Sequence, residues 1–124
     1  VLCMLTTQGP HDYDGSATDH FMLREADLLI SNGLGLDDTF VSRMLQNNRN
    51  TSLKRLVVGN VIEQKNHDLM VHGKGDAGPE HKGHMHGAHD PHIWLGIPQA
   101  IEMTKLIAEK LGEIDSKKKD DYKK

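Results

Sequence analysis

The sequence predicts an α/β fold in which helices cover both sides of a mainly parallel sheet. Short, nearly continuous apolar runs alternate along the chain with segments of helical periodicity. Apolar runs of this kind are typical of strands that are buried on both faces. With 124 residues and a hydrophobic fraction of 36%, the chain has the size of one small domain with a modest core.

Local signals predict the individual elements. Ser16 and Asp19 have the spacing of a capping box at the start of a helix. Apolar residues of the last helix, among them Ile97, Ile101 and Leu111, recur at helical spacing and are expected to face the core. The expected elements are strands over 1–7 and 27–31, a turn over 32–35, a strand within 53–62 centred on 56–58, and helices over 17–26, from Asp37 or Asp38, over 98–114 and from Ser116.

A His-rich segment precedes the last helix. Residues 64–91 carry few apolar side chains and many glycines, so we expect a flexible loop there. Imidazole is the commonest neutral ligand for metals such as zinc, and a His-rich tract broken by glycine is typical of metal binding. The residues predicted to bind metal weakly in this loop are His72, His81, His84, His86 and His89. The alternative interpretation is a polar loop without a metal-binding role.

His92 differs from the other histidines of this segment. The preceding Pro91 has a fixed φ angle and biases Asp90 toward an extended conformation, and the apolar residues 93–95 are expected to enter the core. His11 directly follows the first predicted strand, and ligands of such sheets bind beyond the carboxyl ends of the strands. We therefore expect His11 and His92 to lie close together at one edge of the sheet.

Composition excludes several other classes of protein. The formal net charge of −3 does not provide the basic surface of a nucleic-acid-binding protein. The single cysteine, Cys3, cannot form an internal disulfide, and no transmembrane run or signal peptide is visible. The sequence opens directly on an apolar run at Val1, which favours a piece of a longer protein.

Four short motifs occur in a characteristic order. They are PHDY at residues 10–13, the pair Ser16 and Asp19, ADLLISNGLGL at 26–36 and, after the His-rich segment, DPHIWL at 90–95. Together they resemble the metal-binding solute receptors of bacterial zinc and manganese ABC importers, the ZnuA/TroA-like periplasmic binding proteins. The resemblance extends over nearly the whole chain.

The resemblance implies one lobe of a two-lobe metal receptor with the metal ion in the cleft between the lobes. His11 and His92 would be the metal ligands of the N-terminal lobe, and the second lobe would supply the others. Residues 1–114 would form this lobe, incomplete at its start and including the flexible loop over 64–91. Residues 115–124 would begin the helix that connects the lobes.

The resemblance also implies a receptor rather than an enzyme. Its cargo would be Zn²⁺, favoured by the abundance of imidazole, with Mn²⁺ as the other possibility. Its partner would be the membrane permease of an ABC importer. The protein would be periplasmic or extracytoplasmic, and it would meet the membrane only through the transporter or through a lipid anchor outside this chain.

Two other functions compete with the receptor. One is a metallochaperone or metal-storage module that uses only the His-rich loop. The other is a hydrolase with a His-bound metal, for which Asp12 or Asp90 could be the general base. The sequence contains neither an HExxH motif nor an evident nucleophile with a partner base, which disfavours the hydrolase.

Overall fold

The computed structural model describes Tyr13 and residues 15–66, 69–70 and 90–124. Its α-helices are α1 (Ala17–Glu25), α2 (Asp38–Gln46), α3 (Val58–Lys65) and α4 (Ile97–Ile114). Its strands are β1 (Leu28–Ser31) and β2 (Lys54–Val57), and two short 3₁₀ helices are η2 (Ile93–Leu95) and η3 (Ser116–Lys118). The predicted strand over residues 1–7 lies outside the described residues.

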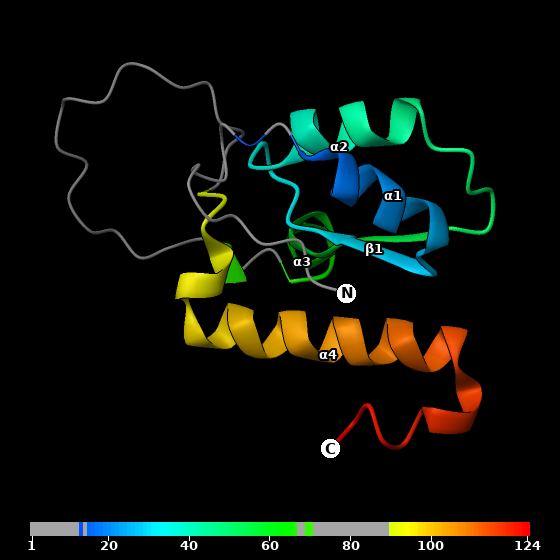
Figure 1. Cartoon of the computed structure of the whole chain (residues 1–124). Helices are drawn as coiled ribbons and strands as arrows, with labels where there is room; N and C mark the ends of the chain where they lie inside the picture. Colours follow the sequence, from blue (N-terminus) through cyan, green and yellow to red (C-terminus); the bar gives the residue numbers. More distant parts are fainter. Residues whose placement is uncertain (1–12, 14, 67–68, 71–89) are drawn as a thin grey trace, which may run out of the picture.

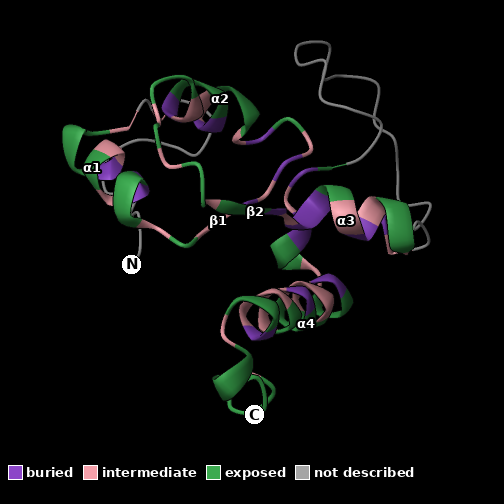
Figure 2. Ribbon diagram, turned by 90° about the vertical axis from the view of Figure 1, so that its right-hand side faces the viewer, coloured by how far each residue is buried: buried purple, intermediate pink, exposed green. Residues whose placement is uncertain are grey.

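The two described strands form a parallel sheet. β1 pairs with β2 in a register that sets Leu28 opposite Lys54 and Ser31 opposite Val57. Helices α2 and α4 lie on opposite sides of this sheet, and α3 continues directly from the end of β2 (Figures 1 and 2). The predicted layering of helices on both sides of a parallel sheet is confirmed.

The core lies where β2, α3, η2 and α4 meet. Val58 and Ile62 are one helical turn apart, and each is at most 1% exposed. Ile93 of η2 is also 1% exposed, and the core cluster is completed by Leu56, Met70 and Leu106. Burial of each such side chain stabilises the fold by about 1.5–3 kcal/mol relative to an exposed one. Since Ile93 belongs to this cluster, the chain next to His92 is fixed to the core.

The start of α3 differs from the prediction. The expected strand continued through Val58, but β2 ends at Val57 and Val58 already begins the helix. The β-branched residues at this point are typical of strands, yet Val58 and Ile62 gain more by packing one helix face against α4. Met70, within the segment over 64–91 that was expected to be a flexible loop, is only 4% exposed and belongs to the core cluster.

The apolar residues before and within α4 are also placed differently from the prediction. Of the apolar residues 93–95 that were expected to enter the core, only Ile93 does, because Trp94 is 41% and Leu95 76% exposed. The helix packs through Gln99, Met103, Leu106 and Ile107, of which Ile107 belongs to the predicted stripe, while Ile97 and Ile101 face outward. A polar contact accompanies this orientation of the helix. The buried side-chain amide of Gln99 donates a hydrogen bond to the main-chain carbonyl of Leu69.

The chain after α4 does not continue as an α-helix. Asp115 has φ −119° and ψ 83°, which takes the chain out of the helical conformation. Residues 116–118 then form the short 3₁₀ helix η3, where a longer helix was expected. None of the helices in the described part of the chain is long and apolar enough to cross a membrane.

Candidate metal-binding site

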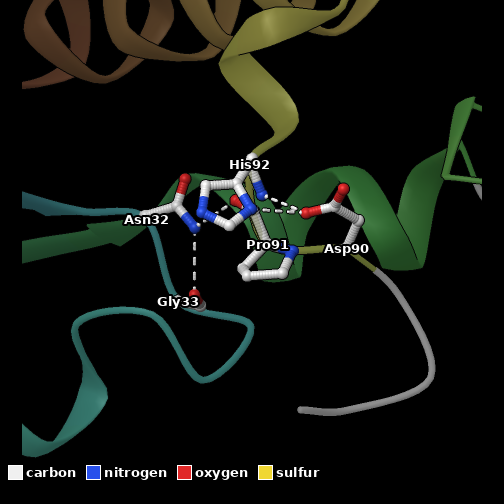
Figure 3. Close-up of polar contacts among 5 residues, drawn as sticks. All are labelled: Asn32, Gly33, Asp90, Pro91 and His92. Atoms are coloured by element: carbon white, nitrogen blue, oxygen red, sulfur yellow. Dashed lines mark hydrogen bonds and ion pairs between the residues drawn. The ribbon is translucent and has the colours of Figure 1, made fainter. Parts of the chain in front are cut away.

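His92 is the one predicted metal ligand that falls within the described residues. It precedes η2 and lies beside the turn that follows β1, because the side chain of Asn32 donates a hydrogen bond of 2.9 Å to the carbonyl oxygen of Pro91 (Figure 3). This is the carboxyl end of the parallel sheet. The other predicted ligands lie outside the described residues; they are His11, His72, His81, His84, His86 and His89.

The carboxylate of Asp90 holds His92 at two points. Its Oδ1 atom lies 2.7 Å from the Nδ1 atom of the ring and accepts a hydrogen bond of 2.9 Å from the backbone N–H of His92 (Figure 3). The ring also packs edge-on against Trp94, with 5.3 Å between the ring centroids and an angle of 66° between the planes. Three contacts therefore define the orientation of a side chain that is 38% exposed.

The contact with Asp90 determines which ring nitrogen can bind a metal. A carboxylate only accepts hydrogen bonds, so a neutral His92 donates its proton from Nδ1 and carries its lone pair on Nε2. Histidine ligands of metals are commonly oriented by such a carboxylate. The geometry of Asp90 and His92 therefore matches the arrangement of such ligands.

The turn after β1 is held rigidly in place. The carboxylate of Asp37 accepts hydrogen bonds from the backbone N–H groups of Asn32 (2.7 Å) and Gly33 (2.8 Å). Gly33, Leu34 and Gly35 all have positive φ angles, and Leu34 is the only non-glycine residue of the described chain with this conformation. The backbone N–H of Gly59 in α3 donates to the carbonyl oxygen of Asn32. Asn32 is thus fixed from two directions.

A second anchored segment directly follows His11. The hydroxyl group of Tyr13 donates a hydrogen bond to the buried carboxylate of Asp19, which also accepts from the backbone N–H and the hydroxyl of Ser16. The ring of Tyr13 packs edge-on against Phe40 of α2, with a centroid distance of 5.0 Å. These contacts include the predicted capping box and tie the chain two residues after His11 to both α1 and α2.

The described residues alone do not form a complete metal site. Within Tyr13, 15–66, 69–70 and 90–124, no group of three or more His, Cys, Asp and Glu side chains is arranged to hold a metal ion. Zinc takes four ligands in most structural sites and three protein ligands in catalytic ones. His92 can therefore contribute to a site only together with ligands from elsewhere.

The sequence did not point to all the residues that shape this site. The pair Asn32 and Gly33 predicted the turn, but nothing local indicated that the Asn32 side chain would bind Pro91, 59 residues further along the chain. The order Asp90, Pro91, His92 placed a carboxylate near the ring without indicating that it contacts Nδ1.

The helix–sheet–helix unit is an α/β domain, and it carries an oriented histidine at the end of the sheet where ligands of such domains bind. Comparison with known families identifies the chain further. Residues 2–124 match the ZnuA family, described as the periplasmic component A of the zinc-uptake complex, and the chain belongs to this family.

Individual relatives are metal-transport proteins. The chain is 28% identical over 120 residues to the manganese ABC transporter substrate-binding lipoprotein PsaA of Streptococcus mitis, covering 94% of this chain and 35% of the relative. It is 28% identical over 121 residues, with the same coverage, to the iron ABC transporter substrate-binding lipoprotein MtsA of Streptococcus pyogenes serotype M1. The chain thus spans about a third of the length of these relatives.

A solved structure shares the fold. The metal-free form of a mutant periplasmic metal-binding protein from Candidatus Liberibacter asiaticus superposes with a TM-score of 0.66 at 20% identity, covering 94% of this chain and 38% of that protein.

Proposed function

We propose that this chain is the metal-binding lobe of an extracytoplasmic solute-binding receptor that captures a divalent transition metal for an ABC importer. The observation that carries the proposal is the mounting of His92, whose ring is oriented by Asp90 at the carboxyl end of the sheet. The membership of residues 2–124 in a metal-uptake family supports the same function. The receptor binds its cargo and catalyses no reaction.

His11 is proposed as the second ligand of this lobe. Two peptide units separate it from Tyr13, so their Cα atoms lie within about 7.6 Å of each other. Tyr13 is tied to Asp19 at the start of α1 and to Phe40 near the start of α2, and α2 begins just after the turn that contains Asn32. This tether supports a position for His11 at the same end of the sheet as His92.

The remaining ligands are proposed to come from a second lobe. The relatives are about three times as long as the matched region, which leaves room for such a lobe. A site divided between two lobes would couple metal binding to their closure, which suits a receptor that must also release its cargo. Residues 1–114 are proposed as one lobe, with the permease of the importer as partner. Contact with the membrane would be indirect, through that permease or a lipid anchor.

Zinc is the proposed cargo, with manganese as the alternative. Two imidazole ligands favour zinc over manganese, which prefers oxygen ligands. The family description names zinc, whereas the relatives named above are manganese and iron proteins. Equilibrium dialysis of the chain without the His-rich residues 72–88 against Zn²⁺, Mn²⁺ and Fe²⁺ under anaerobic conditions ranks the three metals. Stronger retention of Mn²⁺ than of Zn²⁺ would contradict the preference for zinc.

A pair of matched histidine substitutions tests the site itself. The chain should be prepared without residues 72–88, so that the loop histidines in that range do not mask the signal. His92→Ala should then abolish most Zn²⁺ retention. His20→Ala should leave it unchanged, because His20 lies on α1 beside Arg24, Asn47 and Asn48, away from Asp90 and Asn32. Equal retention by both variants would refute a role for His92.

A further inference from the structure

We propose that Asn32 is a positioning residue for the metal ligand His92. Its side-chain amide clamps the peptide unit from which the histidine projects. The proposal rests on the function proposed above for His92, but the clamp itself is a property of the metal-free chain and can be tested without metal.

The peptide unit between Pro91 and His92 is held at both ends. Its carbonyl oxygen accepts a hydrogen bond of 2.9 Å from Nδ2 of Asn32, and its N–H donates one of 2.9 Å to Oδ1 of Asp90 (Figure 3). A peptide unit is planar, and its C=O and N–H groups point in opposite directions when it is trans. No cis peptide bond occurs in the described chain. Fixing both groups therefore restrains the peptide unit from which the His92 residue continues, while the contacts with Asp90 and Trp94 orient the ring itself.

The orientation of the Asn32 amide is itself determined by its neighbours. Nδ2 donates to two main-chain carbonyl oxygens, those of Pro91 (2.9 Å) and Gly33 (3.0 Å). A reversed amide would bring Oδ1 against both of these acceptors, which is repulsive. Oδ1 is buried and has no hydrogen-bond partner among the described residues. The amide thus directs both of its donors at carbonyl groups, at the cost of leaving Oδ1 without a partner in the described part of the chain.

The two hydrogen bonds that hold this peptide unit differ in how far their partners are buried. The side chain of Asp90 is 57% exposed, and contacts between exposed charged groups are weakened by water and salt. Pro91 is buried, and the Asn32 backbone is fixed by Asp37 and Gly59. A buried carbonyl that loses its donor is left unsatisfied, which makes the contact with Asn32 the costlier one to break. Asn32 therefore holds His92 more firmly than Asp90 alone can.

Asn50 provides a matched control for this clamp. Its Nδ2 atom also donates to two main-chain carbonyl oxygens, those of Ala26 (2.8 Å) and Leu23 (3.3 Å). It lies in the loop before β2, at the amino end of the sheet, whereas Asn32 follows β1 at the carboxyl end. Both asparagines are half-buried. Replacing either one removes the same type of contact, but only one of them touches the segment that carries His92.

The test compares Asn32→Ala with Asn50→Ala in the metal-free chain without residues 72–88. Long-range ¹H–¹⁵N NMR spectra in alkaline buffer report the tautomer of each neutral histidine ring. The wild type should show His92 as a single tautomer protonated at Nδ1. Asn32→Ala should give averaged tautomers for His92, while Asn50→Ala should retain the wild-type signals. If Asn32→Ala does not fold, Asn32→Ser replaces it, because a serine hydroxyl is too short to reach the Pro91 carbonyl.

Zinc titration of the same proteins gives the functional readout. Asn32→Ala should weaken binding roughly 10- to 100-fold, the usual effect of removing an outer partner of a metal ligand. Asn50→Ala should bind like the wild type. Unchanged His92 ring signals in Asn32→Ala, or equal changes in both variants, would overturn the proposal. A third result is possible, in which Asn32→Ala gives averaged His92 tautomers but His92→Ala does not change zinc binding. That result would support the clamp and refute the metal-binding function of His92.

Discussion

Replacing Gly59 with alanine should destabilise the protein, although the residue lies in a helix where alanine is normally preferred. A Cβ atom at this position would lie 2.5 Å from the carbonyl oxygen of Asn32 and 2.7 Å from Cδ1 of Leu34. The first neighbour is backbone that cannot rotate away, and Gly59 itself donates its N–H to that oxygen. The substitution must therefore push α3 away from the turn after β1.

The size of the effect follows from three contributions. Loss or stretching of the hydrogen bond costs about 1 kcal/mol, and forcing atoms into a packed site costs about 1–3 kcal/mol. The higher helix propensity of alanine returns up to about 1 kcal/mol. The net loss for Gly59→Ala should be about 1–3 kcal/mol, measured by urea denaturation followed by circular dichroism.

Gly112 in α4 provides the control, because it is buried in a helix and allows the same chemical change. A methyl group added at this position would lie 2.9 Å from Cγ, 3.4 Å from Cβ and 3.5 Å from Cα of Lys119. Rotation about the Cα–Cβ bond of Lys119 can relieve the closest of these contacts, whereas the carbonyl oxygen of Asn32 beside Gly59 has no such freedom. Gly112→Ala should therefore be neutral or stabilising by up to about 1 kcal/mol. A Gly59→Ala protein as stable as the wild type would show that the contact between α3 and the Asn32 turn does not constrain the fold.

Three further substitutions test the supports of the site. Ile93→Ala should lower the free energy of unfolding in urea by about 2–5 kcal/mol, because Ile93 is 1% exposed. Its control, Leu95→Ala, changes a side chain that is 76% exposed and should stay within about 0.5 kcal/mol of the wild type. Asp19→Ala should lower the free energy of unfolding by about 1–3 kcal/mol through loss of the helix cap and its buried hydrogen bonds, with exposed Asp27→Ala as a neutral control. His92→Ala should unfold in urea almost like the wild type, since the ring is 38% exposed, and a large loss of stability would indicate a structural role instead.

Elements specified by local interactions could be predicted from the sequence. The helix beginning after Ser16 is one example, because its capping box involves residues three positions apart. The parallel strand pair and the turn at Asn32 and Gly33 also follow from short patterns. Pro91 before His92 and Ile93 after it predicted a rigidly held histidine, and both of these residues are buried.

Features decided by distant contacts could not be predicted. Val58 has the β-branched side chain of a strand residue, and only its packing beside Ile62 against α4 explains why it starts a helix. The face of α4 that packs inward was misjudged because a polar residue, Gln99, is buried to bond the Leu69 carbonyl. The clamp by Asn32 depends on a partner 59 residues away, which no local pattern indicates.

The central claim is that His11 and His92 bind the same metal ion. It is tested most directly by zinc affinities of the chain without residues 72–88, measured for the wild type, His11→Ala, His92→Ala and the double variant. Two ligands of one ion act as a unit, so each single substitution should weaken binding nearly as much as both together. Independent, additive effects of the two substitutions, or no effect of either, would contradict the claim.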